Sequence, residues 1–293
     1  MSPITSSLLQ NEADLNRIRA FLAHLPHKPR LVDFEEKIQL PAVRATVRVW
    51  EQNNEIVGMA YVDPFNNLWF ETDLNFAHEL EQLVFDWGVD CIRKRNAETG
   101  EQTTLDFSCD ANDPERLAFT ERFGFDREEV RTLYYSRPLD DTLITYPLPH
   151  GFSIRAALGE SEVDALVALH RAAFGTENMT AEERLAIMRA PGYIPELDLV
   201  AVAPDGGLAA FCICGFDEND PRAGYTDPIG VHPLYQKIGL GKAIVSAGLR
   251  NLQLRGARIA RLGTSSQNNA MQKLAERMGF ICEAEKFWFS KKI

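Results

Sequence analysis

The sequence contains little that would fit a secreted, membrane-spanning or nucleic-acid-binding protein. It has no apolar run long enough to cross a bilayer. Residues 1–10 lack both a basic segment and an apolar core, so we expect no secretory signal. The net charge of −11 argues against nucleic acid or an acidic membrane as the main partner. It is compatible with a cationic or neutral small substrate.

Cysteine is also scarce, and its five positions form an odd, scattered set: Cys91, Cys109, Cys212, Cys214 and Cys282. Such a set predicts reduced thiols and a cytoplasmic location. Cys212 and Cys214 lie two apart on a predicted strand, so their side chains should face the same way. No further ligands are spaced to hold a metal with them, and we expect buried structural thiols and no metal.

The length of 293 residues fits two ordinary domains. Two stretches share one predicted order: helix, hairpin, strand, long helix, strand, short helix, Gly-Phe, strand. The two Gly-Phe pairs, Gly124-Phe125 and Gly279-Phe280, lie 155 residues apart, and a proline-containing linker at 139–150 separates the stretches. We interpret this order as an internal duplication with domains at 1–140 and 151–293. The alternative is coincidence.

The most informative stretch runs from Gly230 to Lys242 and reads Gly-Val-His-Pro-Leu-Tyr-Gln-Lys-Ile-Gly-Leu-Gly-Lys. A strand is predicted to end near Val231, because Pro233 has no amide donor for a ladder. A helix is predicted to begin at about Gly239. The N–H groups of its first turn then have no partner within the helix and are suited to bind an anion, ideally a phosphate.

Glycines and lysines in this turn support the same interpretation. Gly239 and Gly241 let the backbone come close to a ligand. Lys237 and Lys242 oppose the helix dipole, so their presence suggests a bound anion. Taken without its context, the glycine pair favours a plain strand-to-helix turn.

The context extends well beyond the turn. Gln236-x-x-Gly239-x-Gly241 follows Val-His-Pro, and it is followed by a predicted strand at 259–264, by Asn268 and by a short helix ending in Gly279-Phe280. This order resembles the GCN5-related N-acetyltransferase (GNAT) family over residues 152–289. The resemblance implies an α/β fold with two tandem acyl-CoA N-acyltransferase-like domains, each a splayed mixed sheet flanked by helices.

The resemblance also implies the cofactor and its binding residues. Acetyl-CoA would lie between two parallel strands, with its pantetheine arm along the strand that ends at Val231 and its pyrophosphate on the amides of the loop. The expected cofactor-binding residues are Ile229, Gly230, Val231, Gln236, Lys237, Ile238, Gly239, Leu240, Gly241, Lys242 and Asn268. Asn268 has a second interpretation as the cap of the helix that follows it. The segment 174–179 would border the acceptor.

The first half lacks the loop. The corresponding turn, Asp73-Leu74-Asn75, contains no glycine, and Glu71, Asp73 and Glu79 place negative charge where a phosphate would lie. Like charges repel a pyrophosphate. We therefore expect this half to be degenerate, with a structural role or a role in shaping the acceptor pocket. The alternative is a different, unphosphorylated ligand.

Catalysis is where the sequence departs from the family pattern. Asp227 is the expected general base, with Tyr225 on the same face of the strand. Asp227 has a second interpretation as a turn residue before Pro228. The backbone N–H of Val231 or a neighbour would hold the oxyanion. Ala275 stands where many family members have a tyrosine acid. The thiolate would then leave unassisted, water or another group would protonate it, or this half would bind the cofactor without chemistry.

The sequence thus predicts an N-acetyltransferase that moves an acetyl group from acetyl-CoA to a primary amine of a small molecule, by direct attack in a ternary complex. Two alternatives are a non-catalytic acyl-CoA-binding or sensing protein and a tandem acyltransferase of thiol-cofactor biosynthesis. We expect a small-molecule amine as partner, neither nucleic acid nor membrane, and a monomer or homodimer.

Overall fold

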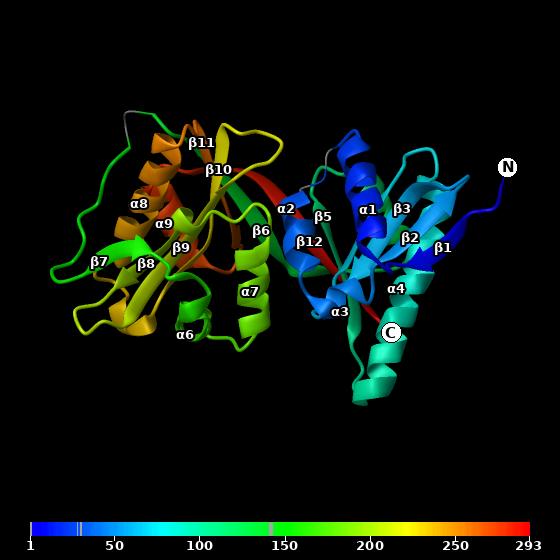
Figure 1. Cartoon of the computed structure of the whole chain (residues 1–293), viewed down its shortest axis with the longest axis horizontal. Helices are drawn as coiled ribbons and strands as arrows, with labels where there is room; N and C mark the ends of the chain where they lie inside the picture. Colours follow the sequence, from blue (N-terminus) through cyan, green and yellow to red (C-terminus); the bar gives the residue numbers. More distant parts are fainter. Residues whose placement is uncertain (1, 28, 30, 141–142) are drawn as a thin grey trace. The chain divides into compact units, whose positions relative to one another are not determined.

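The computed structural model describes residues 2–27, 29, 31–140 and 143–293 (Figure 1). The chain forms two compact units. Unit 1 consists of Met1–Arg131 and Glu285–Ile293, and unit 2 of Thr132–Ala284. None of the helices in the described ranges is both long and apolar enough to cross a bilayer.

Unit 1 is built on an antiparallel sheet whose four strands lie in the order β1-β2-β3-β4. These strands are β1 (Thr5–Leu8), β2 (Arg48–Gln52), β3 (Glu55–Val62) and β4 (Leu68–Thr72). The remaining elements are α1 (Glu12–His24), α2 (Leu31–Lys37), α3 (Pro41–Arg44), α4 (Ala77–Thr99), β5 (Thr104–Asp110) and α5 (Pro114–Arg122). The long helix α4 buries Leu80, Val84 and Ile92 in a core that includes Phe70 and Phe107.

Unit 2 holds the second set of elements, with strands in the order β6-β11-β10-β9-β8-β7. Its elements are β7 (Ser153–Ala156), α6 (Val163–Phe174), α7 (Ala181–Arg189), β8 (Asp198–Val202), β9 (Leu208–Phe216), β10 (Ala223–Val231), α8 (Leu240–Leu254), β11 (Ile259–Ser265) and α9 (Asn269–Arg277). Three short 3₁₀ turns, at Gly159–Glu162, Pro195–Leu197 and Pro233–Tyr235, connect these elements.

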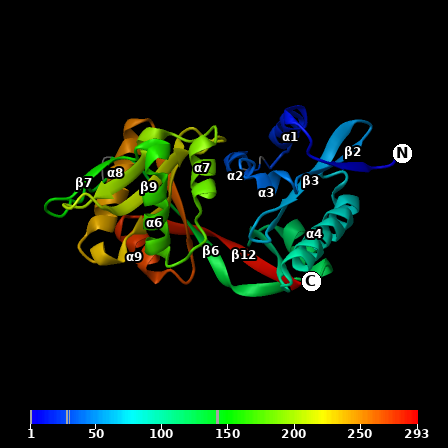
Figure 2. The same cartoon turned by 60° about the horizontal axis from the view of Figure 1, so that its bottom comes forward.

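Helices cover both faces of the unit 2 sheet. On β9, Phe211 and Ile213 pack against a cluster from α6 (Figure 2). The alternate residues Cys212 and Cys214 face α8. A Cβ added at Gly248 of α8 would lie 2.7 Å from the sulfur of Cys214 and 3.3 Å from that of Cys212. The two Sγ atoms are 3.5 Å apart, which confirms that both thiols point the same way, and all five cysteines are free thiols.

Two long strands, β6 (Asp126–Pro138) and β12 (Ile281–Lys292), belong partly to each unit. Residues 132–138 of β6 pair with β11 in unit 2, whereas residues 286–292 of β12 pair with β5 in unit 1. The compact units therefore do not divide where the linker lies. The division into sequence halves at 1–140 and 151–293 stays a prediction about the duplicated segments.

The expected order of elements is present in both halves, with one local correction. The alternation of apolar and polar residues from Arg44 to Trp50 predicts a strand over that range, but β2 begins only at Arg48, because Pro41–Arg44 form the helix α3. Pro41 lies at the first helical position, where its missing N–H is not needed.

Candidate active site

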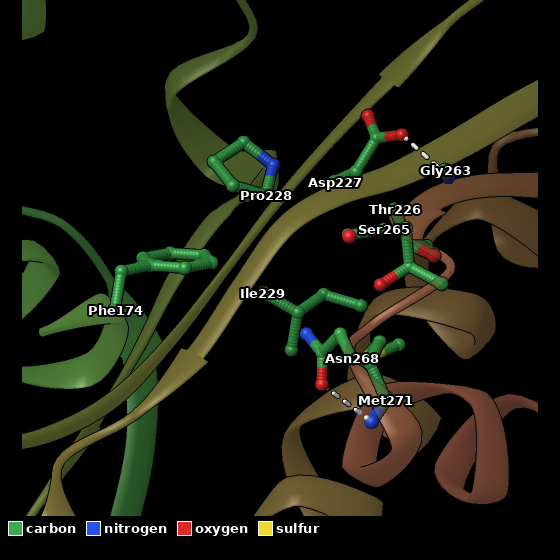
Figure 3. Close-up of a pocket in the computed structure, with 10 residues that line it drawn as sticks. Phe174, Thr226, Asp227, Pro228, Ile229, Gly263, Ser265, Asn268 and Met271 are labelled. Atoms are coloured by element: carbon green, nitrogen blue, oxygen red, sulfur yellow. Dashed lines mark hydrogen bonds between the residues drawn. The ribbon is translucent and has the colours of Figure 1, made fainter. Parts of the chain in front are cut away.

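A split between two parallel strands defines the site in unit 2. Strands β10 and β11 pair at Ala223↔Ile259, Gly224↔Ala260 and Tyr225↔Arg261. Two residues further on, the ladder is replaced by a side chain: Oδ2 of Asp227 accepts the backbone N–H of Gly263 at 2.9 Å (Figure 3). The strands diverge from there.

A cavity of about 410 Å³ lies at this split. It is lined by Phe174, Thr226, Asp227, Pro228, Ile229, Gly263, Thr264, Ser265, Asn268 and Met271. Asp227 is the one charged residue of this set. Figure 3 shows Asp227 and Asn268 on opposite sides of the cavity, with Ile229 between them. The cavity thus combines an apolar wall, hydroxyl groups and one carboxylate.

A bulge in β10 shapes this wall. The register with β9 shifts between Thr226 and Ile229. A bulge bends its strand and redirects side chains, which is common next to active sites. Thr226 is fully buried, and its hydroxyl has no hydrogen-bond partner among the residues that the structure describes.

The backbone beyond the bulge offers donors to the split. The N–H of His232 donates to the carbonyl of Ala209 on the neighbouring β9. Backbone groups alternate in direction along an antiparallel pair, so the N–H of Val231 points away from β9 and toward the side from which β11 has diverged. Gly230 allows close packing here, because a side chain would lie 2.3 Å from the ring of Phe211.

Tyr225 does not join Asp227 at the cavity. Its ring lies over Gly215 on β9, where an added Cβ would be 2.2 Å from the phenol oxygen. Tyr225 is absent from the residues that line the cavity. Of the two expected catalytic residues, the structure brings only Asp227 to this site.

The loop between β10 and α8 leaves its backbone accessible. Residues 236–239 are exposed, and Lys237 and Gly239 adopt left-handed conformations with φ of 64° and 93°. Gly239 precedes α8 without a side-chain cap. Space around Gly239 is open, whereas Leu240 is buried and Gly241 lies against Val231 and Leu274. The first-turn N–H groups of α8 therefore remain available to a ligand.

Two side chains of this loop and of the first turn of α8 contact other groups of unit 2. The amide group of Gln236 donates to the carbonyl of Val231 at 3.2 Å. The ammonium of Lys242 lies 5.0 Å from the ring centre of Tyr146, in cation–π contact. Ile238 is 48% exposed beside the loop.

Asn268 fulfils the capping role that the sequence suggested. Its Oδ1 accepts the N–H of Met271 at 3.0 Å and so caps α9. Because Asn268 also lines the cavity, its NH₂ group can donate to a ligand there. The cap and the ligand contact are therefore compatible.

An aromatic group borders the cavity at the end of α6. His170 lies between Phe174, with ring centres 4.6 Å apart, and Phe211, at 5.4 Å. Burial, and to a smaller extent the positive charge of Arg184, lower the pKa of His170 to about 4. The imidazole is therefore neutral near pH 7 and is not placed as a proton acceptor.

The corresponding turn in unit 1 is closed by its own side chain. The carboxylate of Asp73 accepts the N–H of Asn75 at 2.8 Å and its side-chain amide at 2.9 Å. The expected role of Glu71 is corrected: it is buried and bonded to His27 and Arg116, so it does not present charge to an incoming phosphate. Asp73 and Glu79, which lies in the first turn of α4, still place negative charge where a phosphate would lie.

Sequence patterns gave no reason to single out Met271, Thr264 or Ser265, which also line the cavity. Met271 belongs to the apolar face of α9. Because it lies three residues after Asn268, the helical period could have predicted that both side chains face the cavity. Ala275, which stands where many family members have a tyrosine acid, is fully buried. Its methyl group cannot donate a proton. No group of three or more potential metal ligands is found in the part of the chain that the structure describes.

Comparison with known proteins finds similarity to one family. Residues 163–280 match the model of the Acetyltransferase (GNAT) family. The match covers the part of the chain that holds the β10–β11 split and the turn before α8, and this part is similar to the family. A GCN5-related N-acetyltransferase from Sphaerobacter thermophilus superimposes with a TM-score of 0.69 over 100% of this chain and 97% of its own, at 18% identity. The tandem GNAT protein from the clavulanic acid biosynthesis pathway gives 0.73, over 99% and 98%, at 16% identity. The expected α/β fold of two GNAT domains is confirmed.

Curated relatives are similar over a shorter stretch. A mycothiol acetyltransferase from Salinispora arenicola (strain CNS-205) is 33% identical over 174 residues, which are 57% of this chain and 56% of that protein. One from Arthrobacter sp. (strain FB24) is 32% identical over 140 residues, 45% of this chain and 43% of that protein. The similarity thus spans about half the length of these relatives.

Proposed function

We propose that this protein transfers an acetyl group from acetyl-CoA to a primary amine of a small molecule, by direct attack in a ternary complex. The observation that carries the proposal is the cavity at the β10–β11 split of a GNAT domain, with the carboxylate of Asp227 at its apex. We place the protein in the cytoplasm on the basis of its five free thiols.

The open turn before α8 fits the pyrophosphate of this cosubstrate. Its residues 236–239 are exposed, and α8 begins without a side-chain cap. A helix N-terminus of this kind favours a phosphate group. Lys237 adds positive charge in the turn, and Lys242 adds it in the first turn of α8. In unit 1, Asp73 closes the corresponding turn, which supports one acyl-CoA site per chain.

The rest of the proposed site follows from the split. The backbone of residues 229–231 would hold the pantetheine arm, and the NH₂ group of Asn268 would donate to it from the other side. The thioester of acetyl-CoA supplies an activated acetyl group. The N–H of Val231 is turned toward the split and is suited to hold the oxyanion that develops on attack.

Asp227 is the proposed proton acceptor. An ammonium must lose a proton before its nitrogen can attack, and a carboxylate within the cavity can both attract the ammonium and take that proton. No acid is needed for the departing thiolate, since a free thiol has a pKa of about 8.5. The buried Ala275 is consistent with an unassisted departure.

A second candidate is an acyltransferase of thiol-cofactor biosynthesis. It is favoured by the similarity to the relatives from Salinispora and Arthrobacter, which are both mycothiol acetyltransferases. It would use the same cofactor site and the same transfer, so it differs from the first only in the acceptor. A non-catalytic acyl-CoA-binding role is the remaining alternative, favoured by Ala275.

The decisive test is calorimetric titration of acetyl-CoA followed by an assay for free CoA release with a panel of primary amines. Binding at one site per chain and amine-dependent CoA release are the expected results. Binding without release for any amine, including amino sugars and amino-acid conjugates, would favour the non-catalytic alternative. Absence of binding would overturn the proposal.

A further inference from the structure

Corresponding helices of the two halves are capped in the same way. Oδ1 of Asp113 accepts the N–H of Arg116 at 3.0 Å, and Oδ1 of Asn268 accepts the N–H of Met271 at 3.0 Å. Each pair lies 155 residues from its counterpart, the same offset as the two Gly-Phe pairs. Arg116 and Met271 therefore hold the same third position in α5 and α9.

In unit 2 the side chain at this position leaves space. Met271 lines the cavity at the β10–β11 split and faces its apolar side with Ile229 (Figure 3). A methionine side chain is flexible and uncharged, so it can adapt to a ligand beside it. The cavity stays open next to it.

In unit 1 the residue at this position, Arg116, occupies the corresponding split. Strands β4 and β5 lie in different sheets and are linked by the isolated parallel bridge Asn67↔Asp106, so this half has a split of its own. The guanidinium of Arg116 donates to the carbonyl of Phe70 at 3.0 Å and to Oε2 of Glu71 at 3.0 Å. It also lies 3.9 Å from the ring centre of Phe70.

Neighbouring groups hold this guanidinium in place. The Arg116 side chain is 18% exposed and that of Glu71 9% exposed. Nε2 of His27 contacts the same Oε2 of Glu71 at 2.7 Å. Phe119 of α5 is fully buried between Phe70, at 4.9 Å, and Phe107, at 5.2 Å between ring centres. A carbonyl that could serve a ligand is thus already bonded, and rings fill the space beside it.

We propose that the side chain at this third helical position controls whether the cleft of each half is open to acyl-CoA. Met271 leaves the cleft of unit 2 open, and Arg116 acts as a built-in plug of the cleft in unit 1. The inference rests on the proposed function, because it assumes that the cosubstrate occupies the cavity beside Met271. Asp73 and Arg116 then exclude the cosubstrate from unit 1 at two separate points, the phosphate turn and the split.

The inference is tested by moving the plug into unit 2. Acetyl-CoA is titrated calorimetrically into the wild type and into Met271→Arg, Met271→Phe and Met271→Leu. Arginine copies the plug, and the cavity holds a carboxylate, Asp227, with which it can pair as Arg116 pairs with Glu71. Phenylalanine fills the space without a charge. Leucine is the matched control, because it keeps a similar apolar volume.

The expected result is a loss of affinity of about 30-fold or more, or ~2 kcal/mol, for Met271→Arg and Met271→Phe, with Met271→Leu within about threefold of the wild type. Thermal unfolding shows whether each variant is folded. If Met271→Arg does not fold, Met271→Phe alone tests the inference. Wild-type affinity in a folded Met271→Arg or Met271→Phe would overturn the inference alone. Absence of binding in the wild type would instead overturn the proposed function.

Arg116→Met is the matched variant in the other half. It removes a partner of the buried Glu71, so we expect a lower melting temperature. Binding should stay at one site per chain with affinity within about threefold of the wild type, because Asp73 still closes the phosphate turn of unit 1. A large loss of affinity would contradict the assignment of the cosubstrate to unit 2.

Discussion

The carboxylate of Asp227 takes the place of a backbone carbonyl at the point where β10 and β11 part. The last paired residues are Tyr225 and Arg261, and two residues later Oδ2 of Asp227 accepts the N–H of Gly263 at 2.9 Å. A side chain reaches further than a carbonyl, so the bond satisfies the amide of β11 while the strands separate. The same carboxylate therefore ends the ladder and faces the cavity.

These two roles of Asp227 can be separated by substitution. Asp227→Asn keeps an oxygen that can accept the N–H of Gly263, but the amide cannot take a proton. We expect acetyl-CoA affinity within about threefold of the wild type and kcat/KM for the amine lowered by roughly 10²- to 10⁴-fold. Asp227→Ala should lose affinity as well, because the N–H of Gly263 loses its acceptor.

The measurement is a pH–rate profile beside the titration of acetyl-CoA. In the wild type, the acidic limb reports the base in the free enzyme, and it should disappear in Asp227→Asn. Full activity of the asparagine variant with an unchanged limb would show that Asp227 only shapes the split, as a turn residue before Pro228.

The sequence was informative where function depends on local backbone chemistry. Gly239 and Gly241 predicted the open turn before α8, and the local pattern of apolar residues and turn residues predicted the order of elements in each half. The cap at Asn268 was also predicted. Each of these features is encoded within a few residues, so no tertiary contact is needed to recognise it.

The features that were missed depend on contacts between distant segments. Glu71 was taken for an exposed charge, but His27 and Arg116 pair with it from 44 and 45 residues away. Tyr225 was expected on the same face as Asp227, but it pairs with Gly215 before the β10 bulge, and its ring lies over that glycine. Pattern reasoning cannot see such partners, because neither bulges nor pairings follow from periodicity alone.

Gly241→Glu should remove cofactor binding without unfolding the protein. Gly241 lies in the first turn of α8, where an added Cβ would contact Val231 and Leu274 at an ordinary 3.5 Å. The added Cβ is therefore tolerated, and glutamate brings a negative charge into the first turn of α8, beside the proposed phosphate site. We expect acetyl-CoA affinity to fall by about 100-fold or more, ~2.7 kcal/mol.

Gly241→Ala is the matched control for this variant, since it adds the Cβ without the charge and should bind with nearly wild-type affinity. Calorimetry gives the affinity and the number of sites, and circular dichroism confirms the fold. Unchanged binding by a folded Gly241→Glu would move the phosphate away from this turn. Two sites in the wild type would mean that unit 1 also binds the cofactor.

Breaking a buried ion pair should destabilise unit 2. Arg184 and Asp198 are bonded to each other and are 4% and 0% exposed, and the hydroxyl of Tyr193 donates to the same oxygen of Asp198 at 2.7 Å. Burial raises the pKa of Asp198, while the charge of Arg184 opposes that shift. Arg184→Met leaves the carboxylate without its cation, and we expect a loss of about 3–5 kcal/mol in the free energy of unfolding.

Urea unfolding of the wild type and the variant measures this loss. The exposed pair Arg189–Glu160, with N···O of 2.8 Å and side chains 55% and 54% exposed, provides the control, because Arg189→Met should change stability little. Equal effects at the two arginines would contradict the assignment. A double replacement, Arg184→Met with Asp198→Leu, should recover much of the loss, since it removes both buried charges.

His170 should make the protein less stable in mild acid. Burial against Phe174 and Phe211 lowers its pKa in the folded state to about 4, from an ordinary value of 6.5. Between these two values the unfolded chain binds a proton at this site that the folded protein does not. Stability contributed by His170 is therefore fully present above pH 6.5 and declines as the pH falls toward 4.

The measurement is the free energy of unfolding of the wild type and His170→Gln at several pH values from 4 to 7. The glutamine variant cannot titrate there, so its stability should fall less steeply with decreasing pH, whatever its absolute value. Replacing the exposed His150 by glutamine controls for the loss of a histidine as such. NMR titration of the imidazole gives the pKa directly, and a value near 6.5 would contradict the buried, neutral state.

Because His170 touches Phe174 at the cavity wall, that result would also open a role for it as a second base beside Asp227.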